Sequence, residues 1–500
     1  MRILLSLLLI ATGALPGATL RGTVVENLTG HTLAHASVLL EPVAGSGGAR
    51  LTGHTNRYGL FEFAGAAPGV YLLQATRAPF LTAYYGQKRW NSAGMPLTVT
   101  ESETQFVTIR MMRFAAIGGA VMDENDVGQP GIEVSAYRNT RPLQLIAHAA
   151  ADERGVYRIY GLLPDSYLVR SMGKEIEGTG FKPTFAHETE TPDEARQVDV
   201  DVEQEAREVN LRALPGQLFT LTVTVKTLQP MDVPVTLTLV SEMGRQVAVT
   251  SKSHIFTGLP LGDYEIFAEA PSDSPGVKQS AYQRIPVART DRADLVLRKS
   301  NPVSFDFEGL PLQAAADGTV KLLGRRKDLS GSHDTQAIRL TERFAALTVG
   351  PWEFAVVPID RYYVSGFSGS SGYRNLKRFD GWNEQIVQSW GGSVRFSFSS
   401  TAGAVHGTVA DAGAPVAGAP VFLEPVDLEP ARRITGTYVA VTDIHGQYHF
   451  GNLAPGHYRV LSSFEYQMPD SKIMTEARAR ELQVDARSDT GIDLDLYVIR

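Results

Sequence analysis

A nine-residue unit recurs five times along the chain with constant internal spacing, and this repetition restricts the possible folds more than any other feature. In every copy the first residue is apolar, an aromatic residue stands eight positions later, and a Gly or Asp stands two positions before that aromatic residue. Successive copies begin roughly 95 residues apart, which is too long for a solenoid repeat and suits one small domain. The copies run from Phe63 to Tyr71, Ile159 to Tyr167, Phe256 to Tyr264, Phe344 to Trp352 and Phe450 to Tyr458.

Turn residues and alternating strands surround this unit. Asn56, Asp152 and Asp443 are each followed three positions later by Gly. An Asn or Asp side chain accepts a hydrogen bond from the backbone N–H two residues on, and Gly adopts positive φ, so these segments predict tight turns that lead into strands. The next residues alternate, with Phe61 and Phe63 on one face of the first strand. A turn, Pro-Gly in the clearest copies, and a second alternating strand follow, so we expect a β-hairpin at each copy.

Short strands separated by Gly, Pro, Asn and Asp are typical of β-sandwiches. With 47 Gly and 27 Pro, the chain has little room for long helices, and Met474 to Leu482 is the best helical candidate. The predicted fold is all-β: a tandem array of about five small antiparallel β-sandwich domains of transthyretin-like or immunoglobulin-like type. A signal peptide is expected over residues 1–18. The expected sandwich boundaries are 19–113, 114–214, 215–299, 300–400 and 401–500. The third and fourth sandwiches are expected to diverge in sequence from the others.

The N-terminus has the features of an export signal. Arg2 supplies a positive start, Ile3–Ile10 is nearly all Leu and Ile, and small residues follow, so that cleavage after Ala14 or Ala18 fits. A buried first strand is the alternative, because the apolar run is shorter than the roughly 20 residues that span a bilayer. We therefore expect a secreted, periplasmic or cell-surface protein with no transmembrane segment in the mature chain.

The absence of cysteine and the charge balance exclude several classes of function. Without cysteine there are no disulfides, thiolate nucleophiles or Cys-ligated zinc sites, so each sandwich depends on its own apolar core. The 47 basic and 54 acidic residues give a net charge of −7, which makes nucleic acid a poor partner. The one compact basic cluster, Arg325-Arg326-Lys327, is expected to be solvated in a polar loop.

The motifs around the repeat resemble the carboxypeptidase regulatory-like family. The matching features are the opening Gly22-Thr23-Val24, the turn Thr55–Phe61 and the Leu-x-Pro-Gly-x-Tyr segment that ends at Tyr458. Residues 22–112 and 402–500 match well and 115–213 acceptably, whereas the third and fourth copies match only the segment around the repeat. The resemblance implies transthyretin-like sandwiches, also classed as carbohydrate-binding-like folds. It implies no activity of its own, since such modules accompany peptidases, outer-membrane receptors and adhesins in exported bacterial proteins.

No catalytic or cofactor motif stands out in the sequence. His187-Glu188 lacks the second His of a zinc-binding HExxH motif, and Gly369–Gly372 lacks the strand-to-helix context of a nucleophile elbow. The histidines His445, His449 and His457 are interpreted as surface residues, with a weak metal or pH-sensitive patch as the alternative. Because all of the chain is assigned to repeats, we expect no enzyme, no metal and no cofactor.

Aromatic residues in Gly-rich and polar stretches are the best candidates for ligand binding, because exposed rings stack on sugars or on apolar partner surfaces. The alternative is that these rings fill sandwich cores or pair between strands. The predicted function is an exported non-catalytic binding or scaffold protein whose partner is a glycan, another cell-surface polymer or an envelope protein. A purely structural spacer or adhesion protein of an envelope assembly is the alternative. The candidate residues are Tyr84, Tyr85, Trp90, Tyr362, Tyr363, Phe367, Tyr373, Trp382 and Trp390.

Overall fold

Nearly every regular element of the chain is a β-strand, as the alternating sequence predicts. The computed structural model shows five successive β-sandwiches, each with its own buried apolar core. The expected fold class is therefore confirmed, whereas the expected signal peptide lies almost entirely outside the described residues. The structure describes residues 18–100, 104–139, 143–176, 179–227, 233–241, 244–274, 277–311, 320–357, 359, 361–369, 381–426 and 437–499.

The first two sandwiches have the following strands. The first consists of β1 (Ala18–Glu26), β2 (Ser37–Pro42), β3 (Leu51–His54), β4 (Leu60–Ala66), β5 (Gly69–Thr76), β6 (Ala83–Tyr84), β7 (Leu97–Val99) and β8 (Thr104–Met111). The second consists of β9 (Ala115–Met122), β10 (Glu133–Arg138), β11 (Gln144–Ala150), β12 (Val156–Leu162), β13 (Asp165–Ser171), β14 (Lys174–Ile176), β15 (Thr179–Lys182), β16 (Val198–Val200), β17 (Glu205–Ala206), β18 (Leu211–Arg212) and β19 (Leu214–Pro215).

The third and fourth sandwiches continue the series. The third consists of β20 (Phe219–Thr227), β21 (Val235–Ser241), β22 (Gly244–Thr250), β23 (Ser253–Leu259), β24 (Gly262–Pro271), β25 (Lys278–Val287) and β26 (Asp291–Lys299). The fourth consists of β27 (Val303–Glu308), β28 (Leu322–Asp328), β29 (Gly331–Ser332), β30 (Gln336–Ala337), β31 (Phe344–Ala345), β32 (Gly350–Val356), β33 (Tyr363–Gly369), β34 (Asn383–Val387) and β35 (Gly392–Ser399).

The fifth sandwich contains the helix α2. Its elements are β36 (Gly403–Asp411), β37 (Ala414–Pro415), β38 (Pro420–Pro425), β39 (Tyr438–Val441), β40 (Gln447–Leu453), β41 (Gly456–Ser462), α2 (Ser471–Glu476), β42 (Arg480–Val484), β43 (Asp489–Gly491) and β44 (Leu494–Asp495). The side chain of Asp470 caps α2 by accepting a hydrogen bond from the N–H of Ile473 at 2.8 Å. The helix is shorter than the expected Met474–Leu482 segment because β42 pairs with β41 from Arg480 onward.

All five sandwiches share one pairing plan. The opening strand pairs antiparallel with the first strand of the repeated unit and parallel with the closing strand, as β1 does with β4 and β8. The corresponding opening strands of the other sandwiches are β9, β20, β27 and β36. The sandwiches are thus mainly antiparallel with one parallel junction each. In the third sandwich β25 also pairs with β26, which joins the two sheets into one of seven strands.

The expectation of a hairpin at each repeated unit is wrong. In the first sandwich, β4 pairs with β1 whereas β5 pairs with β2 in the opposite sheet. The same separation in pairing holds for β12 and β13, β31 and β32, and β40 and β41, all of which lie in fully described segments. In the third sandwich β23 and β24 do not pair with each other either, but they lie in the two halves of the single seven-stranded sheet. The turn between the two strands is therefore an arch from one sheet to the other, or between the two halves of the sheet in the third sandwich. Alternation identifies both strands but does not say which strand each one pairs with.

A recurrent hydrogen bond closes each arch. In all five copies the polar group of the final aromatic side chain donates to the backbone carbonyl four residues earlier. A Tyr hydroxyl or Trp N–H that is buried needs such a partner, so the aromatic residue both fills the core and holds the arch. The bonds are Tyr71 to Ala67 (2.7 Å), Tyr167 to Leu163 (2.8 Å), Tyr264 to Pro260 (2.9 Å), Trp352 to Thr348 (2.9 Å) and Tyr458 to Ala454 (2.7 Å).

The turns before the repeated unit form as the sequence predicts. The Oδ1 atom of Asn56 accepts hydrogen bonds from the backbone N–H groups of Tyr58 and Leu60 at 2.9 and 3.1 Å. Asp443 accepts from two backbone N–H groups in the same way, both at 2.8 Å. Gly59 has a φ of +72°, and a Cβ atom there would lie 2.6 Å from a neighbouring side chain, which explains why this turn requires glycine.

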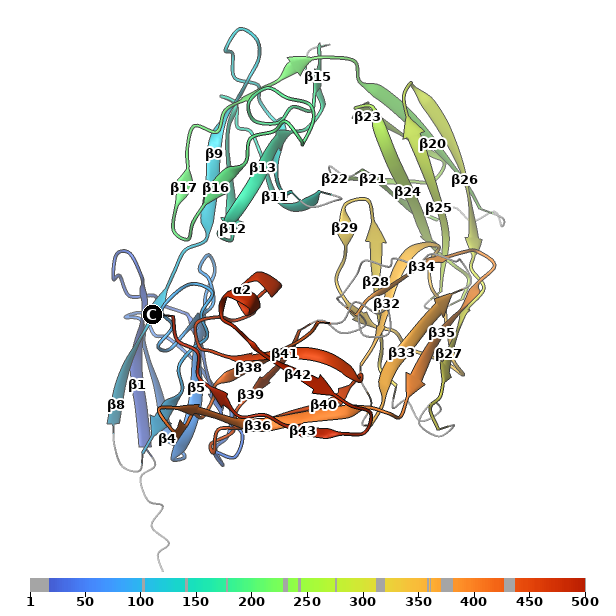
Figure 1. Cartoon of the computed structure of the whole chain (residues 1–500). Coiled ribbons are helices and arrows are strands. Elements are labelled where there is room, and N and C mark those ends of the chain that lie inside the picture. The colour runs from blue at the N-terminus through green and yellow to red at the C-terminus, as the bar shows by residue number, and fades with distance from the viewer. Residues whose placement is uncertain are drawn as a thin grey trace, which may run out of the picture.

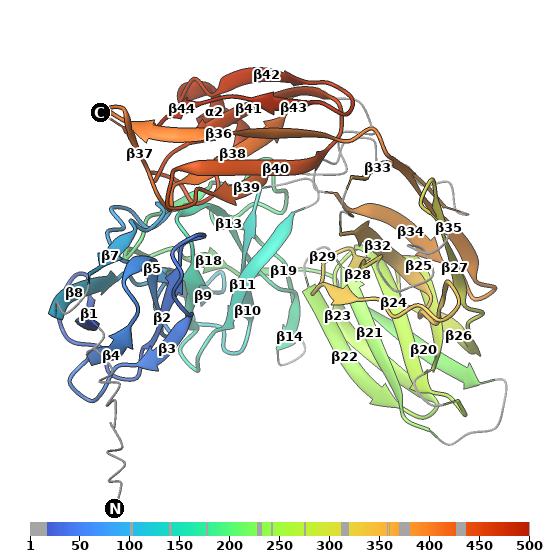
Figure 2. The ribbon, with the colours of Figure 1, turned by 90° about the horizontal axis from the view of Figure 1, so that it is seen from below.

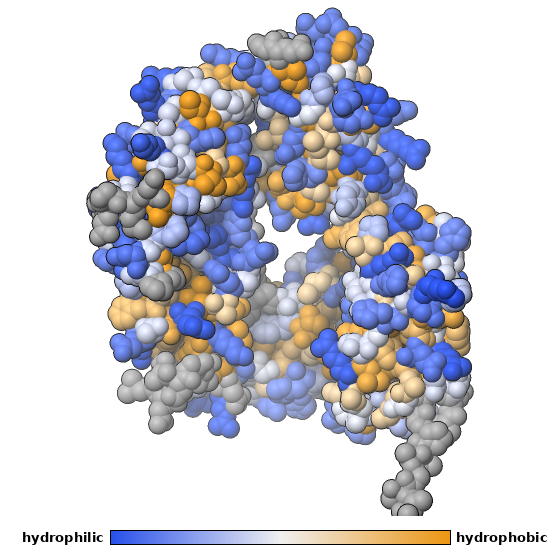
Figure 3. All heavy atoms as spheres, turned by 180° about the vertical axis from the view of Figure 1, so that it is seen from behind, coloured by the Kyte–Doolittle hydropathy of each residue, from blue (hydrophilic) through white to orange (hydrophobic). Residues whose placement is uncertain are grey.

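The five sandwiches follow one another around a ring. Figure 1 shows the first sandwich (β1 to β8) beside the fifth (β36 to β44), so the end of the chain returns to its beginning. Figure 2 shows the same neighbours from a perpendicular direction. In the space-filling view of Figure 3, an opening passes through the middle of the molecule. The array is therefore closed on itself, which the sequence does not indicate.

The hydrogen bond of the arch can be tested by changing Tyr458→Phe. The substitution keeps the ring in the core but leaves the buried carbonyl of Ala454 without its donor, so we expect a loss of roughly 1 to 2 kcal/mol of unfolding free energy. Urea unfolding followed by fluorescence measures the change. The control is Tyr58→Phe, since the Tyr58 side chain is exposed; equal effects of the two substitutions would contradict the assignment.

Candidate functional site

The three candidate aromatic residues of the first sandwich lie in one segment, on β6 and the loop that follows it. Tyr85 packs against the first core. Tyr84 is half-buried, and burial raises the pKa of its hydroxyl above the ordinary value. Trp90 is also half-buried, and its backbone carbonyl accepts a hydrogen bond from the side chain of Gln87 at 2.9 Å. Contacts of Tyr85 with the core and of Gln87 with Trp90 therefore hold this segment in place.

This loop forms much of the contact that closes the ring, and the N–H of Ile444 adds to it by donating to the carbonyl of Ala44 in the first sandwich at 3.1 Å. The N–H of Ala93 donates to the carbonyl of Phe464 in the fifth sandwich at 2.8 Å, and the N–H of Gln467 donates back to the carbonyl of Asn91 at 2.7 Å. Backbone hydrogen bonds of this kind fix the distance and the orientation of the two segments together. The loop after β6 therefore acts as a joint between the first and fifth sandwiches, in addition to any role of its rings in binding.

An ion pair accompanies these backbone bonds. The guanidinium of Arg89 lies 2.8 Å from the carboxylate of Glu465, and the Nζ atom of Lys88 lies 3.4 Å from it. The Glu465 side chain is only 8% exposed. A carboxylate this deeply covered needs its cationic partners, because a buried unpaired charge is costly. Glu465 is a residue that sequence reasoning did not single out.

The candidate aromatic residues of the fourth sandwich do not form one platform. Tyr362 and Phe367 pack partly against the core, and the Tyr363 hydroxyl lies 3.4 Å from the Thr401 hydroxyl. Tyr373 lies outside the described residues. Tyr362 and Phe367 therefore support the sandwich interior.

The two candidate tryptophans of the fourth sandwich differ sharply in exposure. Trp382 is half-buried, with the guanidinium carbon of Arg325 4.1 Å from its ring centroid. Trp390 is 71% exposed and lies in the turn that leads into β35. Tyr363 pairs with Ser399 at the far end of β35, so it cannot share a flat binding surface with Trp390. Among the candidate rings that the structure describes, Trp390 is the most available to a ligand.

The joint between the third and fourth sandwiches is strongly ionic. Arg326 on β28 pairs with Glu269 on β24, and its guanidinium carbon lies 5.0 and 5.3 Å from the ring centroids of Phe267 and Trp352. Burial raises the pKa of Glu269, but Arg326 and Lys278 outweigh burial and hold the pKa below its ordinary value. The joint therefore keeps Glu269 ionised across the neutral range.

A second group of charges continues this joint. The Arg245 guanidinium lies 2.7 Å from the Asp328 carboxylate, and His333 lies 2.8 Å from the same carboxylate. The N–H of Leu329 donates to Glu265 at 2.9 Å. Arg245, Asp328 and His333 border a cleft of about 650 Å³ between the two sandwiches. The cleft walls are largely charges that already neutralise one another.

The expectation that Arg325-Arg326-Lys327 is a solvated loop is wrong. The three residues lie on β28, and each is paired with a carboxylate. Arg325 pairs with Glu353 at 2.6 Å, Arg326 with Glu269, and Lys327 with Glu384 at 2.5 Å. The error arises because the partners are 28 or more positions away in the sequence, so a run of like charges gives no sign of them.

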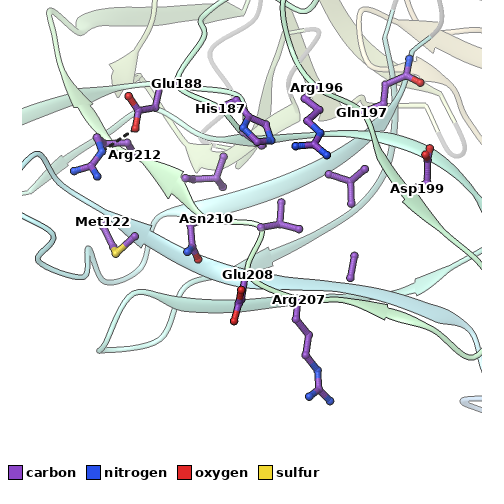
Figure 4. Close-up of a pocket in the computed structure, with 15 residues that line it drawn as sticks. Met122, His187, Glu188, Arg196, Gln197, Asp199, Arg207, Glu208, Asn210 and Arg212 are labelled. Atoms are coloured by element: carbon purple, nitrogen blue, oxygen red, sulfur yellow. Dashed lines mark hydrogen bonds and ion pairs between the residues drawn. The ribbon is translucent and has the colours of Figure 1, made fainter.

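A polar hollow of about 600 Å³ opens on the second sandwich between β16 and the segment that leads into β18 (Figure 4). His187 and Glu188 lie at its rim, and the Glu188 carboxylate is bound by Arg212 at 3.0 Å, as the dashed line in Figure 4 shows. Arg212 also pairs with Asp126 at 2.9 Å. Across the described ranges, no three His, Asp or Glu side chains are arranged to hold a metal.

Comparison with known proteins gives little beyond the fold. The sequence matches no protein-family model and no curated protein, so membership of the carboxypeptidase regulatory-like family stays a prediction. Similar solved structures include the minor pilin GBS52 of Streptococcus agalactiae, with 13% identity, a TM-score of 0.23 and coverage of 40% of this chain and 97% of that chain. The Bacillus anthracis TIE protein has 11% identity, a TM-score of 0.17 and coverage of 93% and 68%. TM-scores this low carry no argument about function.

One further structural finding concerns membranes. In the part of the chain that the structure describes, no helix is long and apolar enough to cross a bilayer.

Reversing the charge of Glu465 tests the joint that closes the ring. Glu465→Lys places a cation beside Arg89 and Lys88 at a covered position, which costs about 3 kcal/mol or more, so we expect the first and fifth sandwiches to separate. Small-angle X-ray scattering would then show a larger radius of gyration with unchanged circular dichroism. The control is Glu153→Lys, at an exposed position of the second sandwich. An unchanged scattering curve for Glu465→Lys would refute the role of this joint.

Acid sensitivity is predicted for the contact between Glu26 on β1 and Arg113, which stands in the short connection from β8 to β9. Hydrogen bonds from Arg113 and Thr29 hold the pKa of the buried Glu26 below its ordinary value of 4.5. The resulting stabilisation is present above pH 4.5 and is lost as the pH falls through the lower folded-state pKa. Thermal unfolding midpoints should therefore fall less on acidification in Glu26→Gln than in the unmodified chain. Glu62→Gln, at an exposed ion pair, is the matched control.

Proposed function

We propose that this chain is an exported, non-catalytic scaffold of the cell envelope that displays its surfaces from a closed ring of sandwiches. The joint between the first and fifth sandwiches supports this proposal most directly. A flexible string of spacers would need no contact between its ends, whereas here three backbone hydrogen bonds and the Arg89–Glu465 ion pair join them. A ring holds its binding surfaces at constant distances and lowers the conformational entropy lost when several of them engage at once.

The charges around the hollows favour a scaffold over an enzyme. In the cleft between the third and fourth sandwiches, Arg326 is paired with Glu269, and Asp328 is paired with Arg245 and lies 2.8 Å from a ring nitrogen of His333. Catalysis needs an acid, base or nucleophile that is free to meet the substrate. Side chains already committed to holding two domains together are poorly suited to that task.

Trp390 supports the finer proposal that the scaffold binds a glycan or another cell-surface polymer. Its indole is 71% exposed, and an exposed aromatic face can stack on a sugar ring. The structural alternative, a spacer or adhesion protein, gains support from the other candidate rings. Tyr85, Tyr362 and Phe367 pack against cores, which is the role that aromatic residues most often have in sandwiches.

Binding of the purified chain to an array of bacterial polysaccharides tests the glycan proposal. We expect saturable binding that Trp390→Ala weakens roughly tenfold or more, because stacking a large aromatic ring contributes about 1.5 kcal/mol or more. Phe106→Ala is the matched control, since Phe106 is 63% exposed on the first sandwich. Absence of binding to every glycan, together with retention of envelope proteins on the immobilised chain, would favour the structural alternative.

A further inference from the structure

The strand β22 forms one edge of the seven-stranded sheet of the third sandwich. The strand order is β22-β21-β24-β25-β26-β20-β23, and within the described part of the chain β22 pairs only with β21. Figure 2 shows β22 at the margin of this sandwich. Alternate residues of an antiparallel edge strand direct their backbone N–H and C=O groups away from the sheet. The edge therefore offers a row of hydrogen-bonding groups to another strand.

Beyond Arg245, the side chains of β22 lack the usual protection of an edge. Val247 and Val249 are 65% and 66% exposed, and both point to the outer face of the sheet, since Ala248 between them packs against the core. Natural edge strands are commonly protected by Lys, Pro or other charged residues. The segment Gln246–Thr250 contains none of these. The edge β42, by contrast, carries Arg480 and Glu481.

We propose that β22 pairs antiparallel with β22 of a second copy of this chain, which makes the ring a symmetric dimer. Centring the pair on Ala248 places Val247 opposite Val249 of the second copy, so two valine pairs form on the outer face. Gln246 then lies opposite Thr250, which pairs polar with polar. Cross-strand pairs of β-branched residues stabilise antiparallel sheets, and an isologous contact of this kind closes after two copies instead of growing into a fibre.

The neighbouring fourth sandwich disfavours the next symmetric register. Centring the pair on Val247 would place Val249 of one copy opposite Arg245 of the other. Arg245 is held by Asp328 at 2.7 Å and by Ser330 at 3.2 Å, so it cannot turn away to make room for a valine. The pairing also does not depend on the proposed glycan binding, because Trp390 lies on a different sandwich.

Sedimentation equilibrium of the full chain over a range of concentrations tests the proposal. The unmodified chain should show a concentration-dependent dimer of twice the monomer mass. The double variant Val247→Lys with Val249→Lys should be monomeric, since it places like charges opposite one another twice. The double variant Val247→Lys with Val249→Glu should still dimerise, because each Lys then faces a Glu of the second copy. Leu261→Lys, at a 73% exposed position of the same sandwich, is the control and should leave the dimer unchanged.

Two results would overturn the proposal. One is an unmodified chain that stays monomeric up to about 200 µM, well above the dissociation constants of specific dimers. The other is equal behaviour of the two double variants, which would show that the valines do not face each other in this register. Unchanged thermal unfolding midpoints of both variants establish that they are folded.

Discussion

The hydrogen bond from a buried aromatic side chain to the carbonyl four residues earlier is the interaction on which each sandwich depends. It occurs in every copy, with Trp352 replacing Tyr in the fourth sandwich and its indole N–H taking the place of the hydroxyl. The bond joins the two sheets at the arch, and the same ring fills the space between them. Because the chain has no disulfide, nothing covalent can substitute for this contact between the sheets. The recurrent eight-residue spacing in the sequence reflects this geometry.

The joints between sandwiches depend on different physics from the cores. The cores are apolar and local in sequence, whereas the joints use charged side chains from distant parts of the chain, such as Arg89 with Glu465 and Arg326 with Glu269. Ion pairs at a partly buried contact add little net stability, because the cost of desolvating the charges offsets much of their attraction. Their main effect is to fix how the two sandwiches are oriented relative to each other. This division explains how one sandwich plan can be repeated while each joint is specific to its two neighbours.

The sequence singled out aromatic residues as candidates for binding but could not say where each ring points. Tyr85 and Trp90 occur in a polar, Gly-rich stretch that is typical of a binding loop, yet that loop contacts the fifth sandwich almost 400 residues later in the chain. Trp390 stands in a similar context and is exposed. Local composition is the same in the two cases, and only the position of a neighbouring domain distinguishes them. The partners of Arg325-Arg326-Lys327 were missed for the same reason.

The sequence alone determined the all-β class, the repetition of about five sandwiches and the tight turns at Asn56 and Asp443, because turn chemistry and alternation are local properties of the backbone. Tertiary structure alone decided that the two strands of each repeated unit pair with other strands and not with each other, and that the first sandwich meets the fifth. Strand pairing and domain contacts depend on which surfaces meet in space. The local sequence around a residue does not show which distant residue it will contact.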